Sequence, residues 1–349
     1  MVPVPDQLLA RLANSPDYYF YAFEGDEAVF VTMDRAAYQR SIFLDHRISP
    51  AAEGSIKVPV AELARKLLAA QETNWIFHVA HCGSTLLARA LEALGDGSRD
   101  EPRDEPGEGL VLREPLALRQ LGLAPDRARL ELTLALLSRR YPGDGATLIK
   151  ANVPVNFLLG EIAAADPSAR AVFLYCGLQD YLLAILRSAN HRAWLRGVTG
   201  QLRGHLCELA HLSDAEVGAA LWLAQMRRFG AALNRMPNAR SLDAEQFFVL
   251  PARALAAAAE CFAIPASPAE IETVIGGSLF ETYSKNPAIE FDNSVRLARR
   301  ERSMGELAGE IARAQEWVER TAPDVGAVLG GISKAALMGQ FECDPRASK

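Results

Sequence analysis

Residues 75–94 read WIFHVAHCGSTLLARALEAL, and this stretch decides the fold. Residues 75–80 are a short apolar run of strand length, and the leucines and alanines after residue 85 recur at helical spacing. Between the two lies the turn HCGST (81–85). The order of strand, glycine turn and helix is half of a β-α-β unit. At such a turn the unpaired N–H groups and the positive end of the helix dipole attract an anion.

The segments that follow alternate between strand-like and helix-like patterns. Short apolar runs predict strands at 109–115, 146–150, 170–175 and 239–243, and helices are predicted at 126–141, 155–165, 180–190 and 192–236. Ser213 and Glu216 have the spacing of a capping box at a break in the last of these helices. Alternation of this kind predicts a three-layer α/β/α fold with a mostly parallel central sheet.

The two flanks of this core have different patterns. Aromatic and β-branched residues on both sides of a Glu-Gly-Asp turn predict a hairpin over residues 17–33, and SIFLD (41–45) is a candidate third strand. A short helix is expected at 60–71, and a long charged helix at 293–320. We therefore divide the chain into an N-terminal β element (1–58), an α/β core (59–265) and a helical C-terminal part (266–349). The acidic, Pro- and Gly-rich stretch 95–109 is predicted to be a surface loop.

Composition narrows the class of protein. The net charge of −6 argues against a nucleic-acid binder held by phosphate contacts. The five scattered cysteines form no CxxC pair, which favours a reducing compartment, and we expect no metal site. The N-terminus lacks the pattern of a secretory signal, and no apolar stretch approaches the roughly 20 residues of a spanning helix. We therefore expect a cytoplasmic protein that does not associate with membranes.

Two known phosphate loops do not match the turn. Walker A requires GxxxxGK[ST], and neither its first glycine nor its lysine is present, which disfavours a P-loop kinase relative. In the cysteine phosphatase loop five residues separate Cys from Arg, whereas six separate Cys82 from Arg89. Gly83 allows close approach of a ligand, and Ser84 and Thr85 add hydroxyl donors. The alternative is an ordinary tight turn capped by a hydroxyl.

HCGSTLL, LREPLALRQL (112–121), LIKANVPVNFL (148–158) and residues 171–188 together resemble the P-loop-type sulfotransferase family. In that family, the first of these segments is the 5′-phosphosulfate loop. The second carries a glutamate base, the third a lysine that supports the sulfonate, and the fourth the 3′-phosphate site. The resemblance covers about residues 75–190 and implies the donor 3′-phosphoadenylyl sulfate (PAPS) with a small-molecule acceptor bearing a hydroxyl or amine.

Carried onto this chain, the resemblance implies Glu114 as general base, Lys150 on the sulfonate and His81 at the usually cationic loop position. The implied donor-binding residues are Cys82, Gly83, Ser84, Thr85, Arg187, Ser188 and Lys285. The chain departs from the family in three places, since His81, Cys176 and Ala184 replace a cation, an arginine and a serine. Arg187 and Ser188, about one helical turn further on, are the candidates to replace the last two.

Each candidate also has a structural interpretation. Glu114 can form a salt bridge with Arg113 at a strand end, and Arg187 and Ser188 can be an ordinary helix surface and cap. The second functional hypothesis is a non-catalytic module that binds a nucleotide, a phosphate or a protein partner. The oligomeric state and the acceptor's identity have no readable signature in the sequence.

Overall fold

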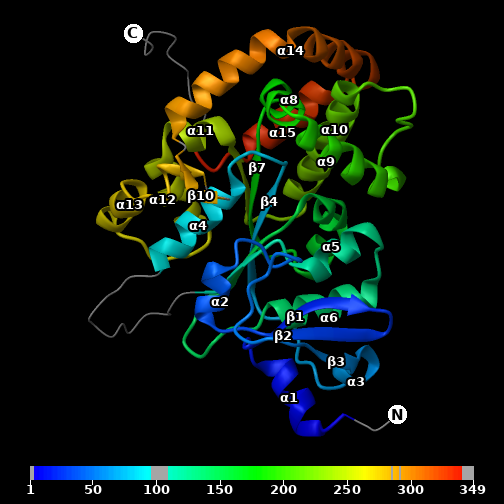
Figure 1. Cartoon of the computed structure of the whole chain (residues 1–349), viewed down its shortest axis with the longest axis vertical. Coiled ribbons are helices and arrows are strands. Elements are labelled where there is room, and N and C mark those ends of the chain that lie inside the picture. The colour runs from blue at the N-terminus through cyan, green and yellow to red at the C-terminus, as the bar shows by residue number, and fades with distance from the viewer. Residues whose placement is uncertain (1–3, 96–108, 284–285, 291, 340–349) are drawn as a thin grey trace.

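A five-stranded parallel sheet forms the centre of the molecule. The computed structural model describes residues 4–95, 109–283, 286–290 and 292–339 (Figure 1). The strand order is β5-β6-β4-β7-β8, and every neighbouring pair is parallel. The strands are β4 (Thr73–His78), β5 (Val111–Arg113), β6 (Thr147–Lys150), β7 (Arg170–Tyr175) and β8 (Ala239–Asp243). The predicted parallel sheet is therefore confirmed, and the ends of its strands lie within a few residues of the predicted ones.

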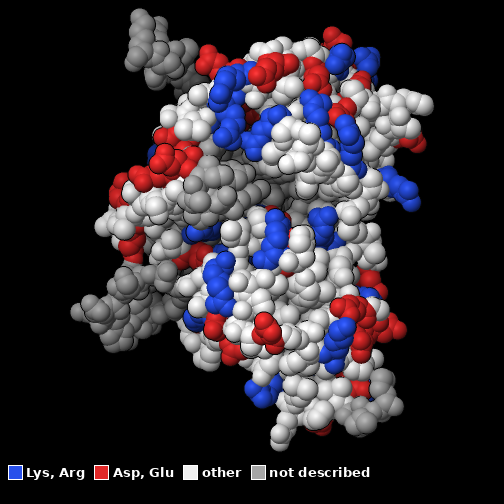
Figure 2. All heavy atoms as spheres, viewed as in Figure 1, with Lys and Arg blue, Asp and Glu red and all other residues white. Residues whose placement is uncertain are grey.

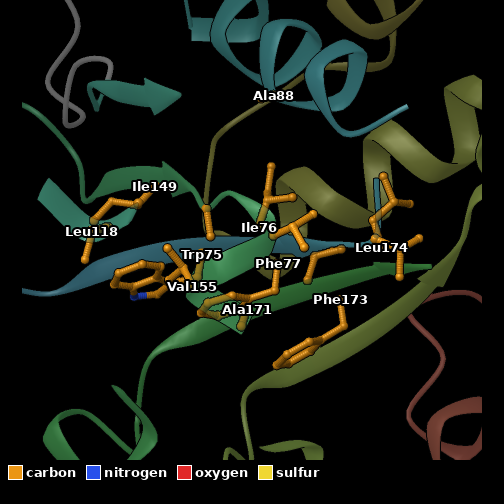
Figure 3. Packing of buried hydrophobic residues seen from close by; sticks show 14 of the residues in the cluster. Trp75, Ile76, Phe77, Ala88, Leu118, Ile149, Val155, Ala171, Phe173 and Leu174 are labelled. Atoms are coloured by element: carbon orange, nitrogen blue, oxygen red, sulfur yellow. The ribbon is translucent and has the colours of Figure 1, made fainter. Parts of the chain in front are cut away.

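Helices cover both faces of this sheet, which confirms the three-layer fold. One face carries α4 (Ser84–Gly95), α12 (Pro251–Cys261) and α13 (Pro268–Ile275), which contact one another. The other carries the 3₁₀ helix η1 (Val153–Leu158) with α7 (Leu159–Ala165), α10 (Asp214–Leu233) and α15 (Val325–Lys334). Ile76 points toward Ala88 of α4, whereas its neighbours Trp75 and Phe77 point to the opposite side (Figure 3). Alternate residues of each strand thus serve different helical layers.

Stacked aromatic rings fill the layer between the sheet and α10. Trp75 and Phe77 stack with ring centroids 5.3 Å apart, and Phe77 stacks on Phe173 of the adjacent strand at 5.2 Å. Phe173 then contacts Phe229 of α10, with centroids 5.0 Å apart. Figure 3 shows the rings of Trp75, Phe77 and Phe173 on the same side of the sheet. Large buried rings of this kind contribute strongly to the burial of apolar surface.

The N-terminal element is a separate antiparallel sheet in the order β1-β2-β3. Its parts are α1 (Asp6–Asn14), β1 (Tyr18–Glu24), β2 (Glu27–Thr32), α2 (Arg35–Arg40), β3 (Ile56–Pro59) and α3 (Val60–Ala64). The hairpin is confirmed, but the expected third strand at 41–45 is wrong, because the third strand is β3. The backbone of Leu44 lies instead beside the end of β5, and its N–H donates to Arg113 O at 2.7 Å. This contact joins the N-terminal element to the central sheet.

The remaining helices and two small strands complete the described part of the chain. They are α5 (Leu116–Leu123), α6 (Arg127–Leu137), α8 (Leu178–Leu186), α9 (Ala189–Gln201), η2 (Arg203–His205), α11 (Ala244–Val249) and α14 (Asn293–Thr321), with the small strands β9 (Thr282–Tyr283) and β10 (Asn286–Glu290). The capping box of Ser213 and Glu216 and the long helix from residue 293 are confirmed. Residues 96–108 of the predicted loop lie outside the described residues. In the part of the chain that the structure describes, no helix is both long and apolar enough to cross a membrane.

Phe173→Ala tests the importance of the aromatic stack. We expect the free energy of unfolding to fall by about 3–5 kcal/mol, because the substitution leaves a cavity between two fully packed layers. Chemical denaturation measures this change. Leu68→Ala is the control, since Leu68 is 70% exposed, and it should change stability by less than about 0.5 kcal/mol. Equal losses in both variants would contradict the assigned core.

Candidate functional site

A cavity of about 520 Å³ lies where the strands of the central sheet end. The turn after β4, Glu114 after β5, Asn152 after β6 and Cys176 after β7 all line it. Strand β4 has β6 on one side and β7 on the other. The order of the strands in the sheet therefore reverses beside β4. Open α/β sheets bind their ligands outside the carboxyl ends of the strands at such a reversal. The cavity is therefore the candidate site.

The turn between β4 and α4 has an unusual backbone. Gly83 has φ +88°, and His81 has φ +62° although it is not a glycine. A Cβ atom on Gly83 would lie 2.7 Å from Cζ of Phe248 in α11. The Cys82 thiol is buried and donates to Val79 O at 3.0 Å. The backbone conformation favours glycine at position 83, and a larger residue would also displace the ring of Phe248.

The first turn of α4 carries the features of an anion site. Ser84 and Thr85 are both buried and both line the cavity. Thr85 Oγ1 has no hydrogen-bond partner among the described residues. A buried hydroxyl without a partner is costly, and a phosphate or sulfate oxygen at the N-terminus of this 12-residue helix would satisfy it. The residues present therefore fit a bound phosphate group.

Glu114 and Lys150 form an ion pair at the ends of β5 and β6. Lys150 Nζ lies 2.5 Å from Glu114 Oε1, and the Glu114 N–H donates to Lys150 O at 2.8 Å. The Lys150 side chain has no exposed surface, whereas 16% of the Glu114 side chain is exposed. Glu114 has φ +57°, a conformation that is strained for a residue with a side chain. The carboxylate thus faces the cavity, and the ammonium lies beneath it.

His78 connects the ion pair to the turn. Its Nε2 lies 3.1 Å from Lys150 Nζ and 2.8 Å from Ala151 O, and its Nδ1 lies 2.8 Å from Val79 O. The position of the ring proton decides whether Nε2 accepts from Lys150 or donates to Ala151. In either state this buried ring links β4 to the chain that follows β6. His78 carries no functional signature in the sequence, because it lies within a strand-like apolar run.

The N-terminal element also contributes to the cavity, through Phe43 and Arg47. Arg47 donates to both oxygens of Asp45, at 2.8 and 2.5 Å, and its Nη2 lies 3.9 Å from Glu114 Oε2. Burial lowers the pKa of Arg47, but the hydrogen bond to Asp45 and the negative charges of Asp45 and Glu114 together outweigh that effect and leave the pKa raised. The guanidinium lies over the ring of Phe43, 3.9 Å from the centroid. Both oxygens of Glu114 therefore have a cation nearby.

Three arginines of α14 also line the cavity, although none of them is among the residues expected from the sequence. They are Arg296, Arg299 and Arg300. Arg296 forms two bonds to Glu245, at 2.7 and 2.8 Å, and Arg300 bonds to Asp180 at 2.6 Å. Their spacing of three and four residues places them on one helix face, and that was the available signal. Figure 2 shows Lys and Arg side chains on both sides of the hollow in the middle of this face.

Arg187 and His81 meet at His191. Arg187 Nη2 lies 2.9 Å from His191 Nε2, and the rings of His81 and His191 are 4.6 Å apart. Arg187 lines the cavity, whereas Ser188 accepts the N–H of His191 as the N-cap of α9 and is not among the lining residues. Cys176 lines the cavity as well, and burial raises the pKa of its thiol well above the usual value. It is therefore a neutral group at this position.

The structure brings most of the predicted residues together. Six of them line the cavity besides Arg187: His81, Cys82, Gly83, Ser84, Thr85 and Glu114. Lys150 contacts Glu114 but has no exposed surface, so it does not present its ammonium to a ligand in this geometry. Lys285 lies outside the described residues. The described residues contain no group of three or more side chains suited to a metal ion.

No family model matches the chain, and no curated protein matches it. Among solved structures, the chain is similar to the sulfotransferase domain from the curacin biosynthetic pathway and to a sulfotransferase from Alicyclobacillus acidocaldarius. The curacin-pathway domain is 11% identical with a TM-score of 0.38, over 69% of this chain and 99% of that domain. The second protein is 15% identical with a TM-score of 0.34, over 72% of this chain and 96% of that chain. The function proposed below rests on the cavity itself.

Gly83→Ala tests the turn. We expect a loss of about 1–3 kcal/mol in the free energy of unfolding, because alanine is strained at this φ and its Cβ meets Phe248. The matched control is Gly160→Ala in α7, where an added Cβ meets nothing within 4 Å and should stabilise by about 0.5–1 kcal/mol. Adding Phe248→Ala to Gly83→Ala should recover the steric part alone. If both glycine variants gain stability, the described turn is incorrect.

Proposed function

We propose that the chain is a sulfotransferase that moves a sulfonyl group from PAPS to a hydroxyl or amine of a small-molecule acceptor. One observation carries this proposal. A single cavity holds both an anion-binding helix N-terminus and a carboxylate, Glu114, that is held from below by the buried ammonium of Lys150. Group transfer from a phosphosulfate needs these two elements, since a leaving phosphate must be stabilised and a proton must be accepted.

The cavity suits an anionic donor. Six arginines and four carboxylates line it, although the chain as a whole carries a net charge of −6. The turn 81–85 and the hydroxyl of Thr85 would hold the phosphate next to the sulfonyl group. Arg187 and the α14 arginines line the same cavity and would supply positive charge to the donor. The volume of about 520 Å³ falls in the range of small-molecule sites.

Glu114 would act as the base. In this proposal Oε1 stays bonded to Lys150, and Oε2, which lies 3.9 Å from Arg47 Nη2, takes the proton from the acceptor hydroxyl. PAPS, when bound, supplies a sulfonyl group on a good leaving group, the nucleotide bisphosphate. As the acceptor oxygen bonds to sulfur, the bond from sulfur to the phosphate oxygen breaks and its electron pair leaves with the nucleotide. In this proposal Lys150 is a positioning residue that fixes the orientation of the carboxylate.

A non-catalytic binding module is the second candidate. The observation in its favour is the complete burial of Lys150, which leaves the ammonium without exposed surface to meet a transferring group. The two candidates differ in one measurable property. Both bind a nucleotide, and only the enzyme transfers label from the donor to an acceptor.

Binding of 3′,5′-adenosine diphosphate, the nucleotide product, tests the donor site. Isothermal calorimetry should detect binding to the wild type, and Thr85→Val should weaken it by about tenfold, because one hydrogen bond to the phosphate is lost. Thr273→Val in α13 is the matched control, since its hydroxyl bonds to Ala269 O of its own helix and is not among the cavity-lining residues. Absence of binding at millimolar nucleotide would refute the proposed donor.

Glu114→Gln separates catalysis from binding. We expect turnover to fall by about 10²–10⁴-fold, because the amide cannot take the acceptor's proton. The affinity for 3′,5′-adenosine diphosphate should stay within a factor of about two to three, which also reports that the variant is folded. Transfer of ³⁵S from labelled donor measures turnover, with Glu131→Gln on the exposed face of α6 as control. Unchanged turnover would exclude Glu114 as the base, and nucleotide binding without wild-type turnover would favour the binding module.

A further inference from the structure

Asn152 is a buried polar residue without a structural partner. It follows β6, lines the cavity, and is only 5% exposed. Its Oδ1 has no hydrogen-bond partner among the described residues. Asparagine amides at such positions are normally satisfied, because a buried amide that lacks partners is costly.

The local backbone explains why this amide has no partner in its own helix. Asn152 occupies the N-cap position of η1, where asparagine usually accepts an N–H from the second or third helical residue. The second residue is Pro154, which has no N–H. The third is Val155, whose N–H already donates to Asn152 O at 3.0 Å. Both usual donors are therefore unavailable, and the side chain makes no capping bond.

Asn156, four residues later, also has an Oδ1 without a partner among the described residues, but it differs in its amide nitrogen and in its position. Its Nδ2 donates to His78 O at 3.0 Å and to Gln225 Oε1 at 2.9 Å, and it does not line the cavity. Asn156 thus fastens η1 to β4 and α10 through its amide nitrogen. Asn152 has no comparable structural contact, so its amide is available to a ligand.

Asn152 and Glu114 belong to the same part of the cavity. The Glu114 N–H bonds to the carbonyl of Lys150, two residues before Asn152, and α5, which begins at Leu116, packs against η1. Arg296 and Arg300 of α14 pair instead with Glu245 on α11 and Asp180 on α8. The cavity therefore has a Glu114 end and an α14 end. The amide of Asn152 lies at the Glu114 end.

We infer that Asn152 binds a second polar group of the acceptor, beside the hydroxyl that Glu114 deprotonates. This inference rests on the proposed function, in which Glu114 takes only the reacting hydroxyl. The unpartnered Oδ1 accepts hydrogen bonds only, and a second O–H or N–H on the acceptor molecule would supply the donor. The acceptor class is thus a compound with two neighbouring hydroxyl or amine groups, and a compound with one such group leaves the amide unsatisfied.

Catechol and 2-methoxyphenol form a matched pair of probes, because they differ in the hydrogen of the second oxygen. In the complex with 3′,5′-adenosine diphosphate, the wild type should bind catechol about tenfold more tightly, as expected for one additional hydrogen bond. Asn152→Ala should remove this preference and leave the nucleotide affinity unchanged. Saturation-transfer NMR measures the probes, and calorimetry measures the nucleotide. Equal binding of the two probes by the wild type, a preference that persists in Asn152→Ala, or no binding of either at millimolar concentration would overturn the inference.

Thermal unfolding provides a measurement that needs no acceptor. If the amide serves a ligand, the Tm of Asn152→Ala should equal or exceed that of the wild type, because no internal hydrogen bond is lost. Asn238→Ala is the matched control, since Asn238 is exposed and donates to Ser168 O. A Tm for Asn152→Ala well below that of the control would identify a structural amide and overturn the inference. If the wild type does not bind 3′,5′-adenosine diphosphate, the proposed function is refuted instead. The failure of the inference and the failure of the proposed function are therefore distinguishable.

Discussion

The ion pair of Lys150 and Glu114 is the interaction on which the candidate site depends. A lysine without exposed surface at the end of β6 requires a counter-charge, and Glu114 supplies it at 2.5 Å. Removing one partner from a buried pair typically costs about 3–5 kcal/mol, because the remaining charge is uncompensated. The pair therefore ties the ends of β5 and β6 together, and His78 extends the link to β4. The carboxylate is consequently held at one place on the cavity wall before any ligand arrives.

The periodicity of the sequence predicted the core well and the flanks less well. The strand ending at His78, the turn at Gly83 and the capping box at Ser213 are local features, so neighbouring residues determine them. The stretch 41–45 has strand-like composition, but it pairs through Leu44 with the chain beside β5. That partner lies about 70 residues away along the chain, so the pattern of neighbouring residues cannot predict the contact. Strand composition reflects packing on a pleated surface more than an intrinsic backbone preference.

The residues of the candidate site also fall into a group that the local sequence predicts and a group that it does not. Glu114 and the turn 81–85 follow strands directly, so the carboxyl-end rule for parallel sheets brings them together. Arg296, Arg299 and Arg300 belong to a helix that begins more than 200 residues after the turn. Their face of α14 turns toward the cavity only because the helix packs against α8 and α10. A charged helix face is most often solvated, so spacing alone did not distinguish these arginines.

The positions of strained backbone indicate which residue of the site is needed for its side chain. Of the described residues other than glycine, only His81, Glu114 and Ala263 have positive φ, and the first two line the cavity. Ala263 follows the end of α12, where a left-handed residue commonly closes a helix. Glycine would relieve the strain at position 114, which for other residues costs of order 1–3 kcal/mol. It would also remove the partner of a buried lysine and a carboxylate that lines the cavity. A strained glutamate at this position is consistent with a requirement for the carboxylate itself.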